Sequence, residues 1–85
     1  RFGSQLSVSP EVTERAFALL AKNKDALAMA PPLGAAAGAL YLAGELHGER
    51  LKQSDVSRVA GVSEVTLRKY YKALKEQASI PAGAA

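Results

Sequence analysis

The stretch QSDVSRVAGVSEVTLRKYYKAL, residues 53–74, has the pattern of two short helices joined by a tight turn. Ser57 is small where two packed helices would cross, and Gly61 falls in a tight turn, where a left-handed backbone is often needed. Ser63 then offers a hydroxyl cap to the second helix. The spacing predicts a helix-turn-helix at about residues 52–77, an arrangement that lays its second helix in the DNA major groove. The positions that must be apolar for such packing are Val56, Ala60, Val62, Leu67 and Tyr70.

The outer face of the second predicted helix, Glu64–Gln77, carries the candidate site. Its inward stripe consists of Leu67, Tyr70, Tyr71 and Leu74, which leaves Val65 outside among basic residues. A β-branched apolar residue gains little from such a place, so it indicates a contact with another molecule. Arg68 can make a bidentate pair with a guanine edge, while Val65, one turn earlier, can pack on a thymine methyl. We expect four further residues to reach DNA phosphates: Ser63, Thr66, Lys69 and Lys72.

Basic charge is concentrated in the last third of the chain. Residues 50–75 hold seven basic and two acidic residues, a net of +5, so the rest of the +3 chain nets −2. An anionic partner is indicated, nucleic acid before membrane, because the segment lacks the broad apolar face of an interfacial helix. Glu64 would repel phosphate unless it accepts from a cytosine amine, and we interpret it mainly as support for the helix dipole.

The remainder of the chain is predicted to be helical as well, with no strand pattern. Residues 1–6 can form a short helical turn. Ser9, Pro10 and Glu11 are typical of a helix start, and the helix is expected to run to about Lys24. It should pack by one stripe, made of Val12, Ala16, Leu19 and Leu20.

The uncharged segment at residues 26–44 is expected to form the core helix. Pro31 and Pro32 interrupt it and leave LGAAAGALYLAG, which is too short for a membrane span of about 20 residues. Gly48 should close this helix. Small residues along it would let neighbouring helices approach closely, namely Gly34, Ala35, Gly38 and Ala39.

Several function classes are disfavoured by composition. The chain has no cysteine and a single histidine, His47, so cysteine-ligated zinc and multi-histidine metal sites are excluded. The lack of cysteine fits a reducing, intracellular compartment. No set of acid, base and nucleophile stands out. We therefore expect a protein that is not an enzyme, needs no cofactor, does not enter membranes and, with no dimer interface evident, is a monomer.

Most of the chain resembles a known family. PPLGAAAGALYLAGELHGERLKQSDVSRVAGVSEVTLRKYYKAL, residues 31–74, is similar to the second cyclin-like repeat of transcription factor B, the archaeal counterpart of eukaryotic TFIIB. SVSPEVTERAFALLAKNKD, residues 7–25, resembles the helix that precedes it in the family. The resemblance covers about residues 1–76, and its most specific parts are ALYLAGEL and VAGVSEVTLRKYYKAL. It implies an all-α, five-helix cyclin-like repeat over residues 1–77 with a C-terminal helix-turn-helix, followed by a flexible tail at 78–85.

The resemblance also implies a function and partners. In the family, the helix-turn-helix of this repeat reads the B recognition element upstream of the TATA box through a valine and an arginine three residues apart, which match Val65 and Arg68. Ser63 and Thr66 match positions that contact phosphate. The implied partners are promoter DNA, the TATA-binding protein and, through the full-length factor, RNA polymerase. The implied location is the cytoplasm, at the archaeal nucleoid, or the nucleus if the chain is eukaryotic.

Two departures from the family pattern weaken parts of this expectation. Met29 and Ala30 stand where a basic residue and a serine usually precede the proline, so a phosphate contact there is in doubt. Lys52 replaces a threonine cap on the first helix of the motif. The family's zinc ribbon and first repeat are absent from these residues. Two alternatives stay open: a helix-turn-helix repressor, and a cyclin-like module that binds proteins and has no direct role on DNA.

Overall fold

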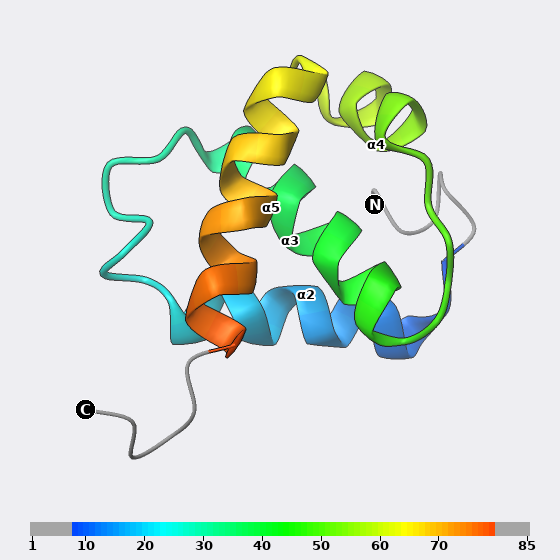
Figure 1. Cartoon of the computed structure of the whole chain (residues 1–85), viewed down its shortest axis with the longest axis horizontal. Helices are drawn as coiled ribbons and strands as arrows, with labels where there is room; N and C mark the ends of the chain where they lie inside the picture. The colour runs from blue at the N-terminus through cyan, green and yellow to red at the C-terminus, as the bar shows by residue number, and fades with distance from the viewer. Residues whose placement is uncertain (1–7, 80–85) are drawn as a thin grey trace.

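The computed structural model of the chain describes residues 8–79, which form four helices and no strand (Figure 1). The helices are α2 at Pro10–Lys22, α3 at Pro32–Leu46, α4 at Gln53–Ala60 and α5 at Glu64–Ser79. The all-helical prediction is confirmed. The helical turn expected over residues 1–6, and with it the fifth helix of the predicted repeat, lies outside the described residues, as do residues 80–85 of the predicted tail.

Helix α2 begins where its sequence predicts. The Val12 amide donates a hydrogen bond of 3.3 Å to the Ser9 hydroxyl oxygen, and Pro10 occupies the first turn, where its missing N–H is not needed. The helix ends at Lys22, two residues before the expected end, because Asn23 caps it. The Asn23 side chain donates to the Leu19 carbonyl at 2.7 Å and closes the last turn.

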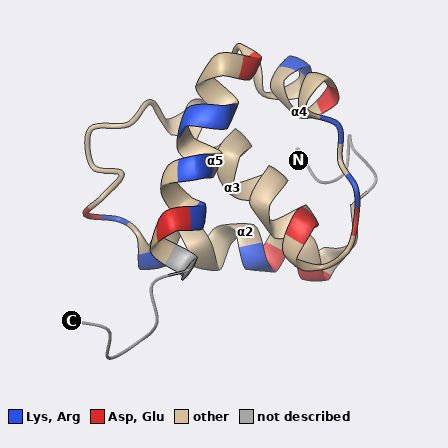
Figure 2. Cartoon of the chain, in the orientation of Figure 1, with Lys and Arg blue, Asp and Glu red and all other residues tan. Residues whose placement is uncertain are grey.

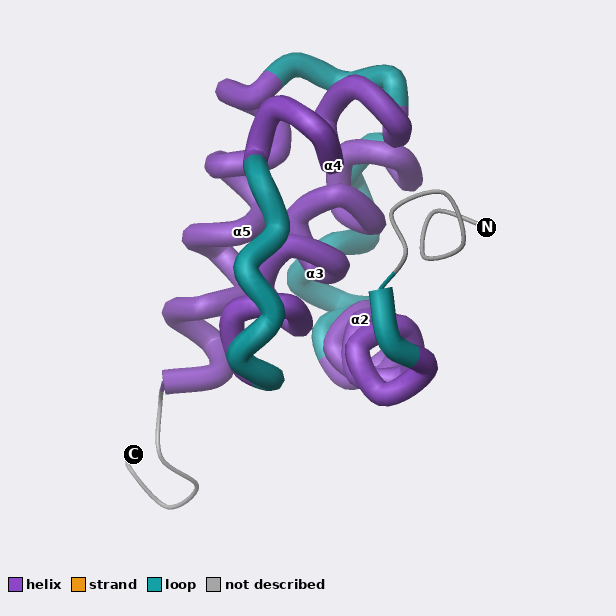
Figure 3. Tube along the Cα trace, turned by 90° about the vertical axis from the view of Figure 1, so that its right-hand side faces the viewer, coloured by secondary structure: helices purple, strands orange, loops and turns teal. Residues whose placement is uncertain are grey.

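Helix α3 forms the centre of the domain and packs against each of the other three helices. In Figure 1 α5 passes in front of it, and Figure 3 shows α2 nearly end-on at the lower right, on the other side of α3 from α5. The prediction that small residues allow close approach is confirmed at Gly38. A Cβ atom there would lie 2.7 Å from the Tyr71 nitrogen and 2.8 Å from the Tyr70 carbonyl carbon. The α3 and α5 backbones therefore meet at this point.

One hydrophobic core connects the four helices. Its largest fully buried side chains are Val12 of α2, Leu42 of α3, Val56 of α4, and Leu67 and Leu74 of α5. Burying side chains of this size stabilises a fold by about 1.5–3 kcal/mol each. The apolar stripes expected on α2 and α5 thus face a common interior. None of the helices described, α2 to α5, is long and apolar enough to span a bilayer.

The ends of the later helices differ slightly from prediction. Helix α3 extends from Pro32 to Leu46, beyond the LGAAAGALYLAG segment at both ends, and Gly48 follows it with the left-handed φ of 74° expected of a closing glycine. Helix α5 continues to Ser79, two residues past the predicted Gln77, in agreement with the good helix propensity of Glu, Gln and Ala. His47 at the end of α3 is exposed.

Candidate functional site

The turn between α4 and α5 is set by Gly61. Its φ of 75° and ψ of 30° lie in the left-handed region, which glycine adopts without steric strain because it has no Cβ atom. The Val62 amide then donates to the Ser57 carbonyl at 3.0 Å, which satisfies the end of α4. A Cβ atom at Gly61 would meet nothing within 4 Å, so backbone conformation and not space requires the glycine. The predicted role of Gly61 is confirmed.

The first turn of α5 is capped by Ser63, as predicted. The Thr66 amide donates to the Ser63 hydroxyl oxygen at 3.1 Å, and that hydroxyl donates in turn to the Thr66 hydroxyl at 3.0 Å. The Thr66 methyl faces α3, since a Cβ atom at Gly34 would lie 2.9 Å from it. Thr66 therefore has an apolar side in the helix contact and a polar side at the surface.

The outer face of α5 bears the side chains that the sequence places there. Val65 is 68% exposed, whereas Leu67 and Leu74 on the opposite side are buried. Lys69 and Lys72 are exposed, and Figure 2 shows blue basic positions along α5. The Lys69 ammonium lies 5.4 Å from the centroid of the half-buried Tyr70 ring, within range of a cation–π interaction.

Arg68 is held more firmly than the sequence indicates. Its Nη1 donates a hydrogen bond of 3.0 Å to the Gln53 side-chain oxygen, and the same nitrogen lies 3.8 Å from a Glu64 carboxylate oxygen. Its side chain is 43% exposed. Glu64 lies in the first turn, where it suits the helix dipole as predicted, and also forms this ion pair. Gln53 was not predicted as part of the site, because it lies fifteen residues away on α4.

The start of α4 lacks a side-chain cap. Lys52 stands at the cap position, where the resemblance would have a threonine, and its side chain makes no capping hydrogen bond. Pro31 likewise precedes α3 without a side-chain bond, and Met29 beside it is 96% exposed. Met29 supplies no positive charge at the start of α3.

A second polar cluster, also not predicted, ties the end of α3 to α5. The Tyr71 hydroxyl donates to a Glu45 carboxylate oxygen, and Lys75 lies 3.0 Å both from that hydroxyl and from the other Glu45 oxygen. The Tyr71 hydroxyl and then Lys75 hold the pKa of the Glu45 carboxyl below its usual value. Burial, followed by the Glu45 hydrogen bond, raises the pKa of Tyr71. The Tyr41 ring meets Tyr71 edge to face, with centroids 5.0 Å apart.

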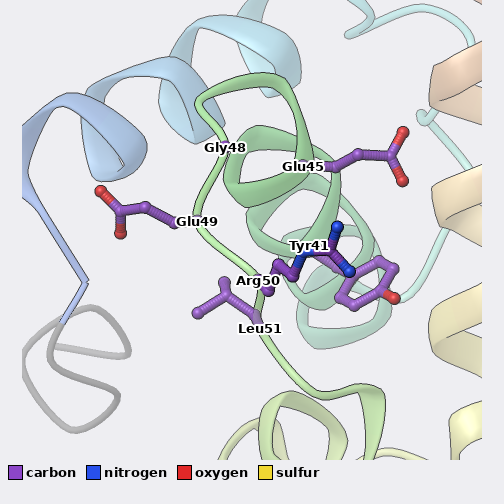
Figure 4. Close-up of a pocket in the computed structure, with 6 residues that line it drawn as sticks. All are labelled: Tyr41, Glu45, Gly48, Glu49, Arg50 and Leu51. Atoms are coloured by element: carbon purple, nitrogen blue, oxygen red, sulfur yellow. The ribbon is translucent and has the colours of Figure 1, made fainter.

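A pocket of about 530 Å³ lies beside this cluster (Figure 4). The Arg50 guanidinium lies by the Tyr41 ring, while Glu45 and Glu49 point to opposite sides. The Glu49 carboxylate accepts from the Ser9 amide at 3.2 Å, so it is engaged at the start of α2. Within residues 8–79 no group of three His, Cys, Asp or Glu side chains is placed to hold a metal ion.

These features define the class of the chain: an all-helical domain in which two C-terminal helices, joined by a tight glycine turn, present a basic outer face with one exposed valine. The chain belongs to the TFIIB repeat family, because the family model described as "Transcription factor TFIIB repeat" matches residues 1–77.

Relatives in archaea agree with this assignment. The chain is 44% identical over 82 residues to the transcription initiation factor IIB of Methanococcus aeolicus, covering 94% of this chain and 25% of that protein. The transcription initiation factor IIB of Methanothermococcus thermolithotrophicus is 44% identical, over 94% of this chain and 24% of that protein. The transcription initiation factor IIB of Archaeoglobus fulgidus is 43% identical, over 94% of this chain and 25% of that protein. The chain therefore spans about a quarter of the length of these relatives.

Proposed function

We propose that this chain is the second cyclin-like repeat of a general transcription initiation factor and that it reads promoter DNA through a helix-turn-helix formed by α4 and α5. The amino-terminal half of α5 enters the major groove at the B recognition element, just upstream of the TATA box. Val65 and Arg68 read base edges there. The family match and the names of the archaeal relatives support the place of the chain in transcription initiation.

The exposure of Val65 is the observation that carries this proposal. A valine that is 68% exposed on the first turns of α5 adds little to the core, and it stands one turn before Arg68. A methyl group can contact thymine and a guanidinium can pair with guanine, so the two side chains together offer a short pattern of base recognition.

Phosphate contacts surround this pair in the proposal. Lys69 and Lys72 are exposed cations on the following turns of α5, suited to the DNA backbone on the side of the groove. The Ser63 hydroxyl is engaged with Thr66, so the Thr66 hydroxyl proton is the better placed of the two to meet a phosphate oxygen. The amino-terminal end of α5 adds the positive end of its dipole.

The remaining parts of the proposal concern the whole factor. The chain acts as a monomer without enzymatic activity or a cofactor, and it works next to the TATA-binding protein on the promoter. RNA polymerase is recruited through the full-length factor. Its proposed location is the archaeal cytoplasm at the nucleoid, in keeping with the archaeal origin of the relatives.

Binding to two duplexes tests the proposal. One carries a B recognition element next to a TATA box, and the other has the upstream element scrambled. The chain should shift the first duplex at lower concentration, and its affinity should fall steeply with salt because counterions are released. Arg68→Ala should lose about 1–3 kcal/mol on the first duplex only. Equal binding of both duplexes, or none, would favour the alternative of a cyclin-like module that binds proteins.

A further inference from the structure

The contact between Gln53 and Arg68 connects the two helices of the proposed motif. Gln53 is the first residue of α4, and its side-chain oxygen accepts from Arg68 of α5 at 3.0 Å. An arginine side chain has donors only, so the Gln53 oxygen must face it and the amide nitrogen must face away. That nitrogen points to the Tyr41 hydroxyl of α3, at 3.5 Å. The Gln53 amide is thus oriented by groups on two other helices.

We infer that Gln53 is a positioning residue for base recognition: it holds the Arg68 guanidinium in the orientation in which it meets a guanine edge. This inference rests on the proposed function. Gln53 itself needs no contact with DNA in this role.

The hydrogen bond between Gln53 and Arg68 orients the guanidinium and leaves it able to bind DNA. The bond to Gln53 uses one N–H of Nη1, and the other N–H groups of the guanidinium remain for a bidentate pair with guanine. An amide oxygen is neutral, so Gln53 orients Arg68 without cancelling the charge that draws it to DNA. Glu64 could do so, but it lies 3.8 Å away on the same exposed helix face, where an ion pair contributes little.

Positioning of this kind raises selectivity because Arg68 loses less side-chain entropy when it contacts guanine. A free arginine side chain has many rotamers, and fixing one of them on DNA opposes binding. Arg68 is already fixed at its tip by a residue from a different helix. The guanine contact therefore forms with less loss of side-chain freedom than an arginine such as the exposed Arg15 of α2 would suffer.

Two substitutions separate this role from simple packing. Gln53→Met keeps the length of the side chain and its apolar stem but removes the amide oxygen. Gln53→Glu keeps an oxygen acceptor for Arg68. Melting curves should show both variants folded, because Gln53 lies at the first position of an eight-residue helix and outside the buried core.

Base preference is measured by selection from a pool of randomised DNA duplexes bound by the chain. The wild type should select guanine at one position, and Arg68→Ala should abolish that selection. Gln53→Met should reduce guanine selection at the same position by about threefold to tenfold, within the range of couplings between contacting residues. Gln53→Glu should keep the guanine preference while weakening all duplexes alike, since its charge repels phosphate. In the Arg68→Ala background, Gln53→Met should change nothing further.

Side-chain nitrogen-15 NMR of the free protein gives a readout without DNA. Arg68 should show slower guanidinium motion than the exposed Arg15 of α2 in the wild type and in Gln53→Glu, and similar motion to Arg15 in Gln53→Met. Unchanged Arg68 motion in Gln53→Met, or unchanged guanine selection, would overturn the positioning role, and a further effect of Gln53→Met in the Arg68→Ala background would make Gln53 a direct DNA contact. If Arg68→Ala leaves selection intact, the proposed function fails and the positioning role fails with it, even where the NMR result holds.

Discussion

Replacing Gly38 by alanine should weaken the contact between α3 and α5. The new Cβ atom would lie 2.7 Å from the Tyr71 nitrogen, 2.8 Å from the Tyr70 carbonyl carbon and 2.9 Å from the Tyr70 Cβ. Two of these neighbours are backbone atoms within α5, so they cannot move aside by a rotamer change. The helices must separate instead.

The magnitude follows from two opposing effects. Overpacking a core costs about 1–3 kcal/mol, and we take about 3 kcal/mol because the contact is with backbone. Alanine is the better helix former by about 1 kcal/mol, which offsets part of this. Gly38→Ala should therefore lower the free energy of unfolding by about 2 kcal/mol, which corresponds to a Tm lower by about 10 °C for a domain of this size.

Gly34→Ala is the matched control, because it makes the same substitution in the same helix. The Cβ atom at Gly34 would meet only side-chain atoms, the Thr66 methyl at 2.9 Å and the Tyr70 ring at 3.2 Å. These can shift, so the loss should be smaller than for Gly38→Ala. Thermal melting by circular dichroism compares the two. A Tm for Gly38→Ala equal to or above that of Gly34→Ala would refute the close approach of the α3 and α5 backbones.

Three further predictions concern the turn, the basic face and acid stability. Gly61→Ala should lower the free energy of unfolding by about 1 kcal/mol in a denaturant titration, because alanine is strained at a φ of 75°. Lys69→Ala and Lys72→Ala should each lower the log-log salt slope of DNA binding by about one unit and weaken all sequences alike. The Tyr71 hydroxyl lowers the pKa of Glu45 in the folded state, so the ionised carboxylate stabilises the fold, and this stabilisation is lost as pH falls through the folded pKa. Glu45→Gln removes the titrating group and should therefore flatten the fall of Tm below pH 4.5.

Each of these has a matched control. Gly61→Asn should lose less stability than Gly61→Ala, since asparagine tolerates the left-handed region. Lys24→Ala, outside α5, should leave the salt slope unchanged. Glu14→Gln on the exposed side of α2 should not alter the acid limb of the Tm profile. A Gly61→Asn variant less stable than Gly61→Ala would contradict the strain argument for Gly61. A change in base selectivity for Lys69→Ala would contradict a phosphate contact, and an unchanged acid limb of the Tm profile in Glu45→Gln would contradict the role of the Glu45 carboxylate.

Local signals in the sequence predicted the fold well. The Ser9 cap, the left-handed Gly61 and the outward position of Val65 each depend on a few neighbouring residues, and all three are found where expected. The end of α2 was missed by two residues, because the asparagine that caps it can also continue a helix. The small residues around Gly38 predicted that some helix would approach closely there, but not which one. The structure shows that this helix is α5.

Contacts between distant residues could not be predicted from the sequence. Gln53 meets Arg68 only because α4 packs against α5, and no local pattern marks a glutamine at the first position of a helix as an arginine partner. The Glu45–Tyr71 bond joins residues 26 apart in the chain. Such pairs depend on how the helices pack around α3. The predicted roles of Val65 and Arg68 in reading bases rest on the family resemblance and on exposure, and they remain predictions.

Base reading by the outer face of α5 is tested by the DNA affinity of Val65→Ala, measured at fixed salt on the promoter duplex and on its scrambled counterpart. Losing a desolvated methyl contact should cost about 1 kcal/mol on the promoter duplex, while the scrambled duplex, held through phosphates, should bind as before. The free energy of unfolding should change by no more than about 0.5 kcal/mol, as is usual at exposed sites. Equal affinities of the variant and the wild type for the promoter duplex, or equal losses on both duplexes, would contradict base reading by the outer face of α5.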